Sequence, residues 1–304
     1  MEQLRFGVES LARLGVYLGV FSAAGAVTLQ WGVLRPLCRQ AENLAAVERL
    51  EKKLLRVGMY AATVLCLLSV VRLLLQTYAA FGIDEGVTLE SVKIIATETA
   101  WGAGWGWQFG SAVALLMAFT VANYYPPLGW LLAIPSTLVV AASVSFTGHA
   151  VSVVNPVVGI GLQSVHIMAA GVWIGSLGLM YYFVFRQEGG SEGLVWESRL
   201  LDRFSPLAVA AVGFLVTAGA VSAFLYLDTW SQITGTDYGR VLLGKIVLFS
   251  LAGSLGLLNW KVVRPQLHRG TGARFLRRTV FVELLGALFA MAATAVLVAL
   301  SMDH

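Results

Sequence analysis

The sequence has few charged residues. Lys, Arg, Asp and Glu together make up 12% of its 304 residues, whereas soluble domains carry about 25%. This shortage excludes an ordinary soluble domain. The net charge is only +4, and the basic residues gather in particular loops, as membrane topology demands. The charge therefore does not indicate a nucleic-acid-binding surface.

Cysteine and histidine are also scarce. The two cysteines are Cys38 and Cys66. We expect the first in a cytoplasmic loop and the second inside a helix, so the sequence indicates no disulfide framework. Histidine occurs only four times. The sequence contains no hydrolase or nucleophile motif, and we therefore do not expect an enzyme.

Hydrophobic residues, in contrast, make up 58% of the chain, and the mean hydropathy is +0.76. A helix that spans a bilayer needs about 20 mostly apolar residues. Eight such segments are present, at about 14–35, 55–82, 105–125, 128–148, 157–185, 205–227, 239–262 and 279–301. We predict an all-α membrane protein in which residues 1–304 form a single integral bundle of eight transmembrane helices.

Lys and Arg predict the orientation of this bundle. They concentrate in the loops after the first, fifth and seventh segments, at 35–56, 186–203 and 261–278. The other loops hold little beyond Lys93 and Arg240. Because basic loops stay in the cytoplasm, we expect both termini on the outer, periplasmic side.

Two of the four histidines bracket one short connection, in "SFTGHAVSVVNPVVGIGLQSVHIMAAGVWIGSLG". His149 ends the fourth segment and His166 lies a few turns into the fifth. A short connection makes the two helices antiparallel neighbours, so the imidazoles are expected at similar depth. Imidazole binds Cu, Zn, Fe and Ni. The pair predicts a shared metal site; the alternatives are two axial ligands of a b-type haem, or two structural histidines.

Other polar groups in the apolar segments are candidates for an ion path or for its support. Gln163 and Trp173 share a helical stripe with His166, and Lys245 and Glu283 lie inside the last two segments. Ionisable groups in lipid are costly and should pair or line a path. The alternative for these charges is structural anchoring.

The C-terminal sequence "SMDH" gives a weaker candidate for a metal site. Met302 and His304 would offer soft-metal ligands on the outer side. The alternative is a frayed tail.

Five stretches in order carry a family resemblance: "SFTGHAVS", "HIMAAGVWIGSLGLM", "RFSPLAVAAVGFLVTAGAVSA", "TDYGRVLLGKIVLFSLAGSLGLLNWKVVRPQL" and "LRRTVFVELLGALFAMAATAVL". On these stretches the chain resembles the CopD family of bacterial copper-handling membrane proteins, from about residue 100 to residue 301. The resemblance implies an inner-membrane protein of eight helices that handles copper ions. It places the family's histidines at His149 and His166. It also marks three further family positions: Tyr238, Lys245 and Glu283.

The resemblance also implies a partner, a periplasmic copper carrier of the CopC type, which would here be a separate chain. Three functions follow as hypotheses. The first is movement of copper across the inner membrane from an outer site at His149 and His166. The second is electron transfer by a b-haem held by the same two histidines. The third is delivery of copper to another complex without transport.

Overall fold

The computed structural model describes residues 2–38, 44–146, 155–186, 190–226, 235–268 and 271–300. Almost all of these residues are helical, and no strand occurs among them. The first part of the chain forms α1 (Glu2–Thr28), η1 (Leu29–Leu34), α2 (Arg35–Cys38), α3 (Leu44–Glu85), α4 (Leu89–Glu98), α5 (Ala100–Tyr124) and α6 (Pro126–Phe146). The second part forms α7 (Pro156–Ala170), η3 (Gly171–Gly175), α8 (Ser176–Met180), η4 (Tyr181–Phe185), α9 (Gly190–Tyr226), α11 (Asp237–Leu258), η5 (Asn259–Val263), α12 (Arg264–His268) and α13 (Ala273–Leu300). The η elements are π-helical turns within longer helices. The all-α prediction is confirmed.

Seven helical stretches of the described chain are long and apolar enough to cross a membrane, and they match the first seven predicted segments. They are Gly7–Cys38, Leu44–Gly82, Ala100–Tyr124, Pro126–Phe146, Val157–Phe185, Gly193–Leu225 and Gly239–Leu267. The eighth predicted segment lies in α13, a helix of 28 residues that is not among the seven. Three arginines and Glu283 lie in the first half of α13, and its side chains after Thr294 lie outside the described ones. The count of eight spans therefore stays a prediction.

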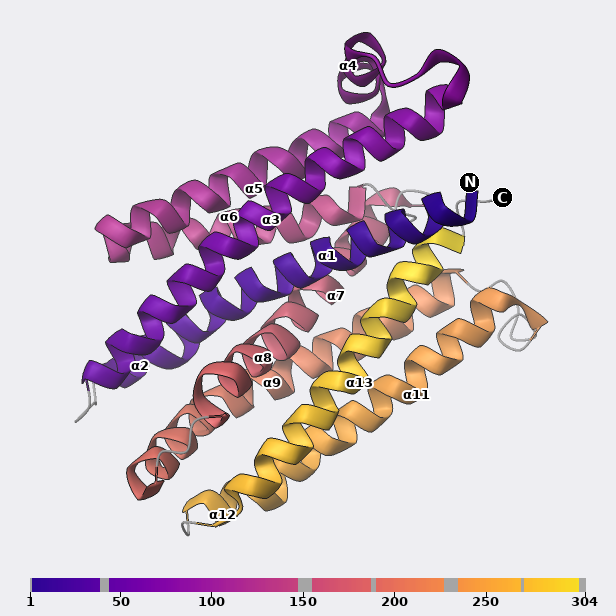
Figure 1. Cartoon of the computed structure of the whole chain (residues 1–304). Helices are drawn as coiled ribbons and strands as arrows, with labels where there is room; N and C mark the ends of the chain where they lie inside the picture. Colours follow the sequence, from indigo (N-terminus) through magenta and orange to yellow (C-terminus); the bar gives the residue numbers. More distant parts are fainter. Residues whose placement is uncertain are drawn as a thin grey trace.

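Helix α1 runs through the middle of the bundle (Figure 1), with α3 and α6 packed on one side and α7, α8 and α13 on the other. The helices α5 and α6 form one antiparallel pair and α11 and α13 form another. The start of α1 and the end of α13 lie at the same end of the bundle, and α2 and α12 lie at the opposite end (Figure 1).

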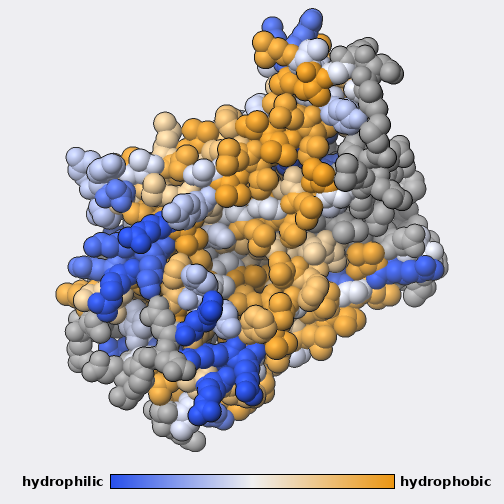
Figure 2. Space-filling model, in the orientation of Figure 1, coloured by the Kyte–Doolittle hydropathy of each residue, from blue (hydrophilic) through white to orange (hydrophobic). Residues whose placement is uncertain are grey.

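The surface of the bundle is mostly apolar. Figure 2 shows a broad orange area over its middle, and blue side chains gather toward the end where α2 and α12 lie. Large apolar side chains are exposed on several helices, among them Leu67, Phe214 and Leu251. Apolar side chains turned outward are expected where the surrounding solvent is lipid.

Small residues let α1 take this central position. Ala23, Ala24 and Ala26 are buried, and Gly25 meets Gly175 of η3 backbone to backbone. A Cβ placed at Gly175 would lie 1.9 Å from the carbonyl oxygen of Phe21. Lipid provides no hydrophobic driving force between helices, so helices in membranes associate largely through van der Waals packing. Small residues allow the close approach that this packing needs.

Several helix boundaries differ from those predicted by hydropathy. Helix α3 begins at Leu44 and α9 at Gly190, each more than ten residues before the apolar segment starts. The short helix α4 was not predicted at all. It begins at a capping box in which Thr88 and Ser91 exchange side-chain-to-backbone hydrogen bonds of 3.1 and 2.9 Å. The apolar segment of a sequence marks only the part of a helix that crosses the hydrocarbon core. The helix itself continues into polar sequence until the end groups of its backbone are capped.

The close contact between α1 and η3 gives a stability prediction. Gly175→Ala should lower the unfolding midpoint in detergent, because overpacking against the Phe21 carbonyl costs about 1–3 kcal/mol. Gly161→Ala on α7 is the matched control: a Cβ there meets nothing within 4 Å. It should leave the midpoint unchanged or raise it, since Ala favours helix over Gly. Equal midpoints for the two variants would contradict the close approach.

Candidate functional site

A buried polar cluster, which we call the Glu283 cluster, consists of Trp173, Asn259, Thr279 and Glu283. The indole N–H of Trp173 donates to Oε1 of Glu283 at 3.1 Å, and Nδ2 of Asn259 donates to Oε2 at 3.1 Å. The hydroxyl of Thr279 donates to Oδ1 of Asn259 at 2.5 Å. All four side chains are buried, Glu283 to 3% exposure. Both oxygens of a carboxylate deep in the bundle therefore accept hydrogen bonds from neutral donors.

Two π-helical turns hold the donors of this cluster. Trp173 lies in η3 and Asn259 in η5. A π-turn adds a residue to the helix and so shifts the direction of the side chains; such turns are frequent at functional sites. The Trp173 ring also packs edge-on against Phe249 of α11, with ring centroids 5.7 Å apart. Gly256 leaves room for the carboxylate, since a Cβ there would lie 3.0 Å from Oε1.

His166 lies at the meeting of α7, α9 and α11. The side chain is partly buried and hydrogen-bonds the backbone of Leu215 in α9. The ring faces Gly219, where an added Cβ would lie 3.4 Å from Cε1. The ammonium of Lys245 in α11 interacts electrostatically with the imidazole. The structure thus brings together two polar residues that the sequence places about 80 positions apart.

The His166 contacts and the Glu283 cluster lie along the same pair of helices. On α11, Lys245 interacts with His166, and Phe249, one turn further on, packs against Trp173. Residues four apart share a helix face. A line of side chains therefore runs from His166 to Trp173 and on to Glu283, over a helix rise of about 10 Å between the first two.

Lys245 is not the counter-ion of Glu283. The carboxylate packs against Gly256, which follows Lys245 by eleven residues on α11. Eleven residues correspond to about 16 Å of helix. The two charged groups therefore lie at different levels of the bundle.

The remaining candidates fall partly outside the described residues. His149, Met302 and His304 lie outside them, and of Tyr238 only the backbone, in the first turn of α11, is described. Gln163 is partly buried on α7. The described residues contain no group of three or more His, Cys, Asp or Glu placed to hold a metal ion. The shared site of His149 and His166 therefore stays a prediction.

The predicted pairing of the two helices on either side of the short connection is present. Helices α6 and α7 pack against each other, and the hydroxyls of Ser145 and Ser164 lie 3.3 Å apart. Ser145 precedes His149 by four residues and Ser164 precedes His166 by two. The end of α6 thus lies beside the first turns of α7.

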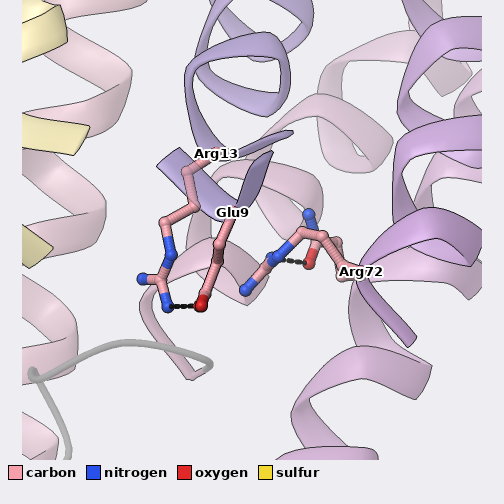
Figure 3. A network of polar contacts seen from close by, with 4 residues as sticks. Glu9, Arg13 and Arg72 are labelled. Carbon is pink, nitrogen blue, oxygen red and sulfur yellow. Dashed lines mark hydrogen bonds and ion pairs between the residues drawn. The ribbon is translucent and has the colours of Figure 1, made fainter. Parts of the chain in front are cut away.

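A second polar cluster, between α1, α3 and α5, was not predicted (Figure 3). Arg13 donates to Glu9 at 2.6 Å, and Arg72 donates to Gln108 at 2.7 Å. The Arg72 guanidinium also lies 5.8 Å from the ring centroid of Trp101. The four-residue spacing of Glu9 and Arg13 was the available signal for their pair.

The donor groups of this second cluster set it apart from a copper site. Arg13, Arg72 and Gln108 are buried. A guanidinium group offers only N–H donors and has no lone pair to give to a metal ion. The described residues that suit a cation path, His166 and Glu283, therefore lie along α7, α9, α11 and α13, and not between α1 and α3.

Long apolar helices packed around a buried carboxylate and partly buried imidazole and ammonium groups define a multi-pass helical membrane protein. Residues 198–297 match the family described as copper resistance protein D, and residues 7–153 match the copper resistance protein D-like N-terminal domain. The chain belongs to this copper resistance protein D family.

Two relatives agree with this assignment. The chain is 30% identical over 234 residues to the copper transport protein CutJ of Bacillus subtilis (strain 168); the match covers 73% of this chain and 42% of that protein. It is 28% identical over 240 residues to copper resistance protein D of Pseudomonas syringae pv. tomato, covering 74% of this chain and 76% of that protein. The chain thus spans less than half the length of the first relative. No solved structure matches it.

The Glu283 cluster gives a second stability prediction. Trp173→Phe keeps an aromatic ring but removes the N–H that Glu283 Oε1 accepts. Losing a hydrogen bond to a charged group costs about 1.5–3 kcal/mol, so the unfolding midpoint in detergent should fall by the corresponding amount. Trp107→Phe is the control, because Trp107 is 64% exposed. If both variants unfold at the wild-type midpoint, the indole hydrogen bond does not contribute to stability.

Proposed function

We propose that this protein moves copper ions across the bacterial inner membrane, with eight transmembrane helices and both termini on the periplasmic side. Copper is the cargo and would first bind at His149 and His166, near the outer ends of α6 and α7. A separate periplasmic carrier of the CopC type would deliver the ion there. The family assignment and the names of the two relatives, which concern copper transport and copper resistance, support copper as the cargo.

One observation carries the transport proposal: the line of side chains from His166 through Trp173 to Glu283. A protein that only captured copper on its outer face would need ligands at that face and nothing deeper. Here a partly buried imidazole is followed, deeper in the bundle, by a fully buried carboxylate on the neighbouring helix. Buried ionisable groups in membrane proteins are costly and mark ion pathways.

The chemistry of the outer residues fits a copper ion. Neutral imidazole is a common ligand of copper. Lys245 adds a positive charge beside His166, which weakens cation binding there and favours onward movement over tight retention. Gln163 and Tyr238 lie on the same helices, α7 and α11, and we assign them a supporting place beside this entry. Met302 and His304 remain candidates for a first contact on the outer side.

Delivery of copper to another complex is the second candidate function, because the same outer site would serve it. Copper, and not haem, is the proposed ligand of the histidine pair because the names of both relatives concern copper. We do not propose a catalytic reaction for the chain.

The proposal predicts the copper content of cells that produce the protein. His166→Ala should return cell copper to the level of cells without the protein, because the entry site loses one of its two imidazoles. Val165→Ala is the matched control on the same turn of α7, since Val165 is 44% exposed; it should behave as wild type. Equal membrane levels of the variants must be checked by immunoblot. A wild-type copper content in the His166→Ala cells would contradict the proposed entry site.

A further inference from the structure

We propose that Glu283 binds and releases a proton as copper passes through the bundle, so that copper movement is coupled to proton movement. The inference deepens the proposed function and rests on it for the copper part. It concerns a carboxylate that is placed away from the histidine ligands, in the inner part of the line of side chains described above.

Glu283 has no cation among its described hydrogen-bond partners. Glu283 is 3% exposed, and its described hydrogen bonds come only from Trp173 and Asn259, both neutral. An isolated buried carboxylate is costly and takes up either a cation or a proton. A group in this position is therefore suited to alternate between the two.

Among the side chains that the structure describes, no other charged or titratable group on the surrounding elements occupies this place. Lys245 lies about 16 Å away along α11, and Lys261 in η5 is exposed. On α13, Arg277 pairs with Glu197 at 3.7 Å. The elements packed against α13 carry further titratable residues: Glu9, Arg13, Tyr17, Tyr181, Tyr182, Asp237, Tyr238 and Arg240. None of these contributes a described hydrogen bond or ion pair to Glu283.

The Glu283 cluster can satisfy both protonation states of the carboxyl group. In the arrangement seen, the carboxylate accepts from Asn259 Nδ2, while Asn259 Oδ1 accepts from Thr279. When Glu283 gains a proton, its new O–H needs an acceptor. A half-turn of the Asn259 amide supplies Oδ1 for that O–H and directs Nδ2 at the Thr279 oxygen.

Thr279 can follow this change without losing its own bond. Its hydroxyl already lies 3.0 Å from the carbonyl oxygens of Phe275 and Leu276. After the Asn259 amide turns, the hydroxyl donates to one of these carbonyls and accepts from Nδ2. Every donor thus keeps an acceptor in both states, which avoids the cost of an unsatisfied buried polar group.

The coupling step is a simple exchange. A copper ion that moves inward past His166 and Trp173 brings positive charge near Glu283. The charge stabilises the carboxylate, the O–H bond of the acid breaks, and the proton passes to solvent water as hydronium. When copper has moved on, the carboxylate takes a proton from hydronium again. No electron is transferred in this step.

The test is infrared difference spectroscopy of the purified full-length chain. A protonated buried carboxyl gives a C=O stretching band that a carboxylate lacks. We expect such a band to appear as the pH falls, and we expect its Glu283 part to disappear when copper is added and to be lost in Glu283→Gln. Glu197→Gln is the matched control, since Glu197 is an equally buried carboxylate that has Arg277 as a partner; it should keep the band.

Thr279 gives a second pair of variants that leaves the carboxyl in place. Thr279→Val removes the hydroxyl and should shift the pH midpoint of the Glu283 band, whereas Thr279→Ser should restore the wild-type midpoint. Equal midpoints for Val, Ser and wild type would overturn the role of the amide turn. A purely structural role of Thr279 would change stability without moving this midpoint.

The outcomes separate this inference from the transport proposal. A Glu283 band that ignores copper, or no Glu283-dependent band at any pH, overturns the coupling whatever the cell copper assay shows. If that assay shows no copper movement by the wild type, the transport proposal fails. A Glu283 band that titrates with pH then still supports a proton site but not its coupling to copper.

Discussion

The structure depends on one constraint: a polar group inside a bundle surrounded by lipid must find its partner inside the bundle. Glu283 shows this most clearly, because its two oxygens take their bonds from Trp173 on one helix and Asn259 on another. These bonds connect η3, η5 and α13. Removing one partner leaves a buried group unsatisfied, which costs more than the bond contributes. The packing of the second part of the chain is therefore tied to the cluster that we assign to ion movement.

The two polar clusters lie on opposite sides of α1. The arginine-containing cluster lies between α1, α3 and α5 and packs around Gln108 and Trp101. The His166 contacts and the Glu283 cluster lie on the other side of α1. Because α1 meets η3 backbone to backbone at Gly25 and Gly175, the central helix connects the two sides. The arginine-containing cluster falls within the first matched family region, residues 7–153. Asn259 and Glu283 fall within the second, residues 198–297, whereas His166 and Trp173 lie between the two regions.

Many of the helices and some of the candidate site residues could be predicted from the sequence, for physical reasons that differ from one element to the next. Long apolar segments must be helical in lipid, so seven spans and the pairing of α6 with α7 followed from hydropathy and a short connection. Lys245 and Glu283 stood out because charge is rare in such segments. The role of Asn259 was missed, because its partners Glu283 and Thr279 come from α13, and the π-turn that aims it is set by packing. The capping pair Thr88 and Ser91 was visible in the sequence but was not used, and α4 was missed for that reason. The Glu9–Arg13 spacing was likewise visible, but only the fold shows that Arg72 lies beside that pair.

Copper flux into sealed proteoliposomes tests the central claim most directly, because it separates movement across the membrane from capture at one face. The account predicts that vesicles with the wild-type protein accumulate copper in the lumen faster than protein-free vesicles, and that His166→Ala lowers the rate to that of protein-free vesicles. A wild-type rate equal to the protein-free rate, with copper still bound to the protein, would contradict transport and favour delivery.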